Sequence, residues 1–159
     1  MSVSFSGSTA LKWGMVGAIA LVSIGCSDNQ AAQCNRLTEV ANKTVGEVQA
    51  IVSGNEQPDG VALRQVATSF DNGKAEMEAL VLSDEQLQGY QTRFIQLYEE
   101  VSVSAQQLSD ALNSQDFDTA QTARDQFQAS TEKEEPLVRE VNEYCAAIAP
   151  TVETVPSSP

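Results

Sequence analysis

Three cysteines carry most of the chemistry that this sequence of 159 residues offers. Cys26 directly follows an apolar run from Trp13 to Gly25, whereas Cys34 and Cys145 lie in two distant polar regions. A thiol can be modified, cross-linked, bound to a metal or used as a nucleophile. The chain has no histidine, which removes the commonest general base and metal ligand and excludes Cys-His and Ser-His-Asp arrangements. The cysteines therefore indicate modification and cross-linking rather than catalysis.

The segment before Cys26 has the layout of a secretory signal peptide. Lys12 precedes the apolar run, and small or apolar residues lead to Cys26. A cysteine directly after Gly25 resembles the lipobox of bacterial lipoproteins, although Ser23 and Ile24 replace the usual leucine and small residue. The resemblance implies cleavage before Cys26 and attachment of a diacylglycerol to its sulfur. We therefore expect a signal peptide over 1–25 and a lipidated linker over 26–29. The alternative is an ordinary cleaved signal with an incidental cysteine.

The charge of the chain limits its partners. The sequence has 9 basic and 22 acidic residues, and cleavage before Cys26 would remove only Lys12, leaving 8 against 22 and a net charge of −14. Binding to nucleic acid requires a basic face, so nucleic acid is excluded as a partner. An acidic body is also not attracted to anionic lipid. We expect membrane lipid to be contacted only through an acyl chain on Cys26.

Helical spacing of apolar residues dominates the rest of the chain and predicts an all-α fold. The predicted helices cover about 30–53, 61–82, 83–112 and 116–148, the third starting with a capping box at Ser83 and Gln86. Pro136 should kink the fourth helix. Short connections favour antiparallel neighbours, so we expect an antiparallel up-down four-helix bundle over 30–149. The proline-containing stretch 150–159 is predicted to be a disordered tail.

Helix lengths predict that Cys34 and Cys145 meet. At a rise of about 1.5 Å per residue, four successive helices return Cys145 to within one turn of the height of Cys34. Two cysteines in an oxidising compartment then favour a disulfide, the alternative being two buried free thiols. The same count predicts that the last two helices outreach the first hairpin by about 12 Å. That end carries Asp110, Asp116, Asp118 and Asp125, and we regard it as a candidate partner-binding tip.

No pattern predicts an enzyme, a metal site or a cofactor. Asp116 and Asp118 could hold a cation, but a helix cap at Asp116 explains them more simply. The aromatic residues Tyr90, Phe94 and Tyr98 share one helical face. They could line a pocket for a flat ligand, although core packing is the favoured interpretation.

The sequence therefore predicts an exported, lipid-anchored protein with a non-catalytic binding, scaffolding or accessory-subunit role. It would lie on the periplasmic or lumenal face of a membrane, or at the cell surface, with a protein partner in the periplasm or lumen. In size, anchor, helices and acidity it resembles the small helical lipoproteins on the lumenal side of cyanobacterial photosystem II. The alternatives are a small-ligand or divalent-cation binding module of the envelope and a sensory or structural bundle.

Overall fold

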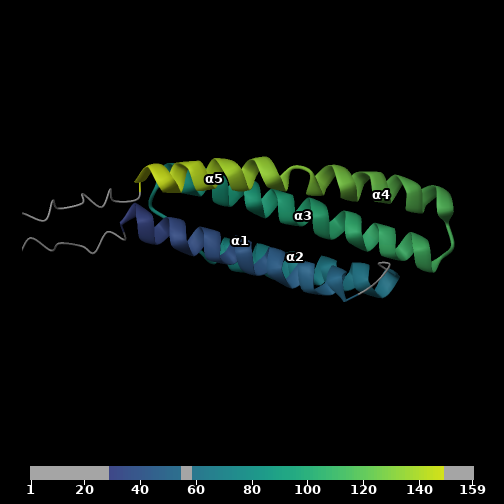
Figure 1. Cartoon of the computed structure of the whole chain (residues 1–159). Coiled ribbons are helices and arrows are strands. Elements are labelled where there is room, and N and C mark those ends of the chain that lie inside the picture. The colour runs from purple at the N-terminus through teal and green to yellow at the C-terminus, as the bar shows by residue number, and fades with distance from the viewer. Residues whose placement is uncertain (1–28, 55–58, 149–159) are drawn as a thin grey trace, which may run out of the picture.

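A computed structural model describes residues 29–54 and 59–148, and these residues form helices without any strand (Figure 1). The expected signal peptide, Cys26 and the tail 150–159 lie outside the described residues. The all-α class is confirmed for the described part of the chain. Its helices are α1 (Gln30–Ser53), α2 (Gly60–Glu78), α3 (Glu85–Asn113), α4 (Phe117–Thr131) and α5 (Glu134–Ile148).

The connection between α2 and α3 is longer than the sequence predicts. Helix α2 ends at Glu78, not near 82, and Asp84 caps α3 by accepting a hydrogen bond from the Leu87 amide at 2.9 Å. Ser83 does not cap the helix because α1 holds it: its amide donates to Gln33 Oε1 at 2.7 Å, and its hydroxyl accepts from Gln33 Nε2 at 3.0 Å. The predicted capping box is therefore wrong by one residue.

The predicted fourth helix consists of two helices. Helix α4 ends at Thr131, and α5 begins at Glu134. Pro136 lies in the first turn of α5, where a missing amide proton costs no helical hydrogen bond. In one continuous helix its ring would clash with the carbonyl group four residues earlier, at Glu132. The interruption therefore falls where proline chemistry requires it.

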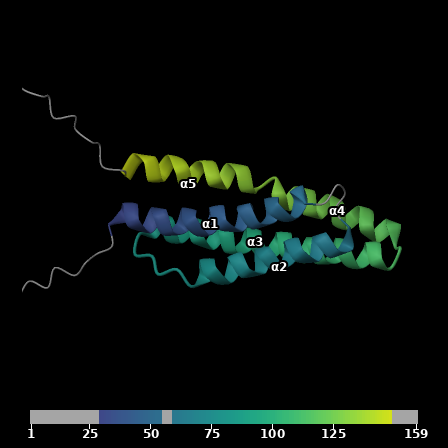
Figure 2. The ribbon, with the colours of Figure 1, turned by 60° about the horizontal axis from the view of Figure 1, so that its bottom comes forward.

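The helices lie side by side in both views of the ribbon (Figures 1 and 2), with the most extensive packing of α2 on α3, of α3 on α4 and of α1 on α2, and with sparser packing of α5 on α1 and α3. Helices α1 and α2 are joined by Gln33 with Ser83 and by an ion pair of Lys43 with Glu76. Contacts of α2 with α3 include Arg64 with Asp110, Asp71 with Ser102, and Lys74 with Glu99. In both pairs the contacts come from several positions along the helices. Among the described helices, none combines the length and the apolar character needed to cross a bilayer.

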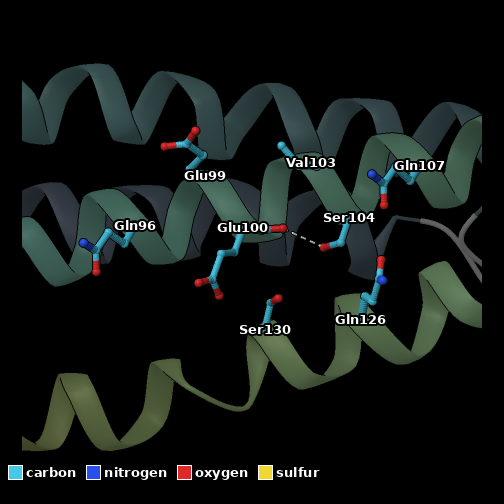
Figure 3. Close-up of a pocket in the computed structure, with 8 residues that line it drawn as sticks. All are labelled: Gln96, Glu99, Glu100, Val103, Ser104, Gln107, Gln126 and Ser130. Carbon is cyan, nitrogen blue, oxygen red and sulfur yellow. Dashed lines mark hydrogen bonds between the residues drawn. The ribbon is translucent and has the colours of Figure 1, made fainter.

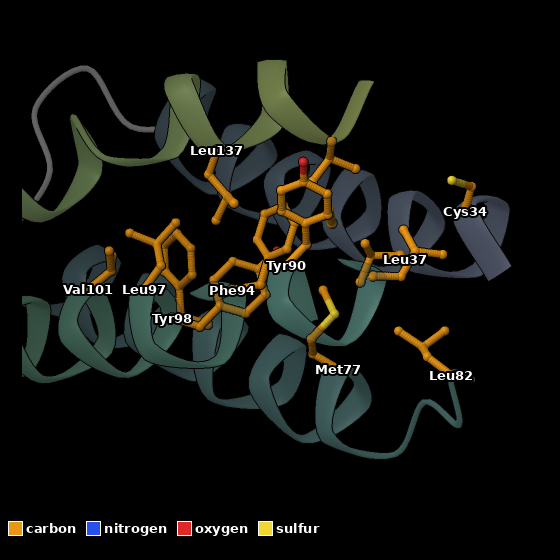
Figure 4. Close-up of a cluster of buried hydrophobic side chains, with 14 of the residues drawn as sticks. Cys34, Leu37, Met77, Leu82, Tyr90, Phe94, Leu97, Tyr98, Val101 and Leu137 are labelled. Carbon is orange, nitrogen blue, oxygen red and sulfur yellow. The ribbon is translucent and has the colours of Figure 1, made fainter. Parts of the chain in front are cut away.

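The core contains a large aromatic cluster and a small alanine-rich one. In the large cluster (Figure 4), the ring of Tyr98 lies 5.4 Å from that of Phe70 and 5.7 Å from that of Phe94. Tyr90 and Tyr144 form an edge-on pair at 5.9 Å. The small cluster consists of Leu63, Leu108, Ala111, Ala120 and Ala123, with Leu112 packed against it. Tyr90, Phe94 and Tyr98 are buried, as core packing predicts.

Candidate functional site

A disulfide joins the start of α1 to the end of α5. Cys34 and Cys145 have Cα atoms 5.8 Å apart and close a separation of 111 residues. Cys34 is buried among the aromatic cluster, and Cys145 is half-buried. The structure therefore brings together the pair that the helix lengths predict. We call this the stapled end of the molecule.

A hydrogen-bonded carboxylate reinforces the stapled end. Besides capping α3, Asp84 accepts hydrogen bonds from Gln30 Nε2 at 2.6 Å and from the Tyr144 hydroxyl at 2.9 Å. The pKa of Asp84 is lowered, chiefly by the Leu87 amide and further by these two side chains. One carboxylate thereby joins α1, the α2–α3 connection and α5. The Asp84 carboxylate and its three donors therefore have structural roles, and they hold these parts of the molecule together.

The four predicted tip aspartates lie near the opposite end, but two already have structural roles. Asp110 forms an ion pair with Arg64 of α2 at 3.0 Å. Asp116 caps α4 by accepting from the amide and hydroxyl of Thr119 at 3.0 and 2.7 Å, and the hydroxyl contributes most to its lowered pKa. Asp118 lies in the first turn of α4, and Asp125 follows two turns later. The predicted cap at Asp116 is confirmed.

The predicted overhang of this end needs correction. Helices α3 and α4 extend past the end of α1 in both views of the ribbon (Figures 1 and 2). Helix α2, however, begins beside the last turns of α3, because the Gly60 carbonyl accepts a hydrogen bond from the Ser109 hydroxyl at 2.7 Å. The non-helical connection 79–84 explains the difference, since extended residues span about twice the helical rise and displace α2 away from the stapled end. We call this region the distal end.

Phe117, the first residue of α4, is exposed at the distal end. Its exposure is 75%, although the sequence pattern places it in the apolar stripe of the fourth helix. Beside it lies a surface depression of about 500 Å³, lined by Leu112, Phe117, Ala120, Gln121, Arg124 and Asp125. Helix α4 packs mainly on α3, and α1 ends at Ser53, so the described helices do not cover this side chain. The apolar pattern places Phe117 on the apolar face of its helix. It does not tell whether a neighbouring helix extends far enough to cover the side chain.

A second depression follows the seam between α3 and α4, farther from the distal end (Figure 3). It measures about 510 Å³ and is lined by Gln96, Glu99, Glu100, Val103, Ser104, Gln107, Gln126 and Ser130. Its two carboxylates are already paired, Glu99 with Lys74 at 3.1 Å and Glu100 with Lys133 at 2.6 Å. Sequence reasoning missed this groove. The spacing of Gln96, Glu100, Val103 and Gln107 along one face of the third helix is the signal that could have revealed it.

The described residues contain no group of three or more histidine, cysteine, aspartate or glutamate side chains arranged to hold a metal ion. Comparison of the chain with protein-family models, curated proteins and solved structures gives no match. The geometry of the two ends is therefore the basis for a functional proposal.

Proposed function

We propose that this protein is exported, anchored in a membrane through a lipid on Cys26, and acts without catalysis as a binding, scaffolding or accessory subunit. Its body would be an antiparallel up-down bundle whose fourth segment bends near Pro136. The proposal extends the lipobox resemblance of the segment ending at Cys26.

The disulfide is the observation that carries this proposal, because disulfides persist in oxidising compartments and the bond therefore supports export. Cys34 follows Cys26 by eight residues, and even a fully extended chain of that length spans less than about 30 Å. A lipid on Cys26 would therefore hold the stapled end close to the bilayer. The distal end would point away from it, into the aqueous compartment, where a partner can approach.

The roles of the aspartates favour a protein partner over a cation. Asp110 is paired with Arg64, and Asp116 is occupied as a helix cap, so neither offers a free set of oxygen ligands. Calcium requires six to eight oxygens converging on one point. Charged groups at a protein–protein interface, in contrast, set specificity and the rate of encounter.

The mass of the intact protein extracted from membranes tests the anchoring. We expect cleavage before Cys26, an added diacylglycerol and acyl chain, and the loss of two hydrogens at Cys34 and Cys145. Replacement C26S should abolish the added lipid mass while leaving the disulfide intact. An uncleaved chain, or a cleaved chain with an unmodified Cys26 that remains on the membrane, would contradict the proposal.

Cross-linking in intact cells tests the accessory role. A specific cross-linked complex should weaken when Asp110, Asp116 and Asp118 are replaced by asparagine, which keeps a good helix cap at position 116. Glu39, Glu47 and Glu78 are exposed acidic residues nearer the stapled end, and their replacement by glutamine gives a variant of matched charge. Equal loss in both variants would show a general charge effect and would contradict a distal binding end.

A further inference from the structure

Phe117 is the one aromatic side chain among the large exposed hydrophobic residues of the described chain. Burial of the large apolar area of a phenylalanine side chain stabilises a fold, so 75% exposure forgoes most of that gain. Phe117 also lines the depression together with Ala120, which belongs to the small core cluster, and Leu112, which packs against that cluster. An exposed aromatic ring beside an apolar hollow has the form of a binding hot spot, in which one side chain fills a pocket and others exclude water.

The charge around this hollow is negative. Residues 109–125 contain four aspartates and one arginine, Arg124, which lines the hollow beside Asp125; with Arg64 paired to Asp110, four acidic against two basic groups leave a net charge of −2. Helices α1 and α3 both end without a basic residue in the last turn, so nothing in those turns offsets the negative ends of their dipoles. Asp116 and Asp118, in contrast, already offset the positive end of α4. The hollow, with apolar side chains on one part of its lining and polar ones on the other, thus lies in a region of net negative charge.

This charge selects among possible occupants. A second copy of the chain would present the same carboxylates to them, and like charges across an interface are destabilising. A basic segment would gain attraction at its rim while its apolar side chains fill the hollow. The groove between α3 and α4 (Figure 3) offers less, because Lys74 and Lys133 already pair with its two carboxylates.

We propose that the depression beside Phe117 docks a basic amphipathic segment of a partner protein, with an apolar side chain packed against the Phe117 ring. Lys or Arg residues of that segment face Asp118 and Asp125, which remain free of the ion pair at Asp110 and of the capping bonds at Asp116. The site rests on the proposed function for its place on the outward end of the anchored rod. Its chemistry rests only on the described surface.

Defined peptides test the chemistry on the whole processed protein. The probe is a helical peptide of about four turns with Leu on one face and Lys on the other. Two matched peptides replace Leu by Gln or Lys by Glu, and calorimetry measures each affinity. We expect the Lys/Leu peptide to bind best. Replacement F117S should weaken its binding about tenfold or more, and D118N with D125N should weaken it less and reduce its dependence on salt.

Val81 provides the matched control, because it is 85% exposed on the connection near the stapled end. Replacement V81S should leave the affinity of the Lys/Leu peptide unchanged. The proposal is overturned if F117S binds this peptide as well as the parent protein does, or if the Lys/Gln peptide binds equally well. Preference for the Glu/Leu peptide would also overturn it.

A photo-reactive residue at position 117 in cells identifies the natural occupant. It should cross-link to a basic, apolar segment of another protein, as read by mass spectrometry of the adduct, while the same residue at position 81 should not. Cross-links to lipid or to a second copy of this chain would overturn the proposal. An unacylated Cys26 with intact peptide binding would defeat only the proposed function, whereas correct acylation without peptide binding would defeat only this inference.

Discussion

The two ends of this rod are built by different means. At the stapled end, a disulfide, the Asp84 network and a cluster of aromatic rings join α1, α3 and α5. At the distal end, three alanines and two leucines form the core cluster, and a phenylalanine is left exposed. Large side chains bury more apolar area than alanines, so the free energy of packing is concentrated near the staple.

Because of this difference, one end contributes most to the stability of the fold, and the other end presents the exposed side chains. The stapled end can hold the fold, which leaves the distal end free to keep an apolar side chain and several carboxylates in solvent. Regions with few buried apolar contacts open more easily than the rest of a domain. If the proposed anchoring is correct, the robust end lies beside the membrane and the more easily opened end meets the partner.

Loss of the disulfide should give the largest change. In the chain-entropy model, a bridge that closes 111 residues contributes about 4–5 kcal/mol to the free energy of unfolding. Replacement of Cys34 and Cys145 by serine should lower that free energy by a comparable amount, as measured by urea unfolding. Hydrogen exchange of the folded variant should accelerate most in α1 and α5. Acceleration mainly in α4 would contradict the contrast between the ends.

Two leucine replacements compare the clusters directly. Leu37 is fully buried in the aromatic cluster, and Leu108 is 6% exposed in the alanine-rich one. Leu→Ala changes cost about 2–5 kcal/mol, with the highest cost where the surroundings cannot collapse into the cavity. We expect L37A near the top of that range and L108A near the bottom, since the disulfide restrains the helices around Leu37. Urea unfolding of both variants with the disulfide intact measures the two losses in free energy of unfolding. Equal losses would contradict the difference between the two clusters.

The sequence predicts the stapled end better than the distal end, for a physical reason. Helix lengths alone bring Cys34 and Cys145 to one height, because rise per residue is nearly constant. The cap at Asp116 follows equally from a local rule. The exposure of Phe117 instead depends on where α1 stops and on how far the connection 79–84 displaces α2. Periodicity does not encode these relative heights. A local capping rule likewise does not reveal that distant Gln33 binds the hydroxyl and the amide of Ser83.

Replacement of either of two glycines by alanine should change the free energy of unfolding by a smaller amount. A Cβ on Gly73 would lie 2.3 Å from the hydroxyl oxygen of Thr44 and 2.8 Å from its methyl carbon, whereas one on Gly60 would meet only the end of the Asn113 side chain, at 2.8 Å. Thr44 is β-branched, buried and unable to move aside easily. We expect G73A to destabilise by about 1–3 kcal/mol through overpacking between α1 and α2. G60A should cost less than G73A because the Asn113 amide can rotate away.

Gly89 supplies the control for backbone effects, because a Cβ there would meet nothing within 4 Å. Replacement G89A should stabilise the protein by up to about 1 kcal/mol through helix propensity alone. Thermal unfolding of the three variants separates this gain from the steric cost. A stabilised G73A would show that α1 and α2 are free to move apart, and the close contact at Thr44 would not limit the fold.

The smallest expected effect concerns two carboxyl groups with opposite pKa shifts at the two ends of α5. Hydrogen bonds lower the pKa of Asp84, whereas burial raises the pKa of Glu134, whose Oε1 atom lacks a hydrogen-bond partner within the described residues. A raised pKa means that the folded state binds the proton more tightly, so Glu134 opposes folding increasingly as pH rises through its folded pKa. Replacement E134Q should therefore increase the free energy of unfolding at pH 7 by less than about 1 kcal/mol, since the site is partly solvated. The gain should vanish in acid, where Glu134 is protonated in both states.

The pH dependence at Asp84 has the reverse sign. The stability that Asp84 contributes is present above its unfolded pKa and is lost as pH falls through its folded pKa. Replacement D84N should therefore destabilise the protein at pH 7 and converge with the parent protein in acid. Parallel shifts of the two variants with pH would show that the ends of α5 do not differ in this way.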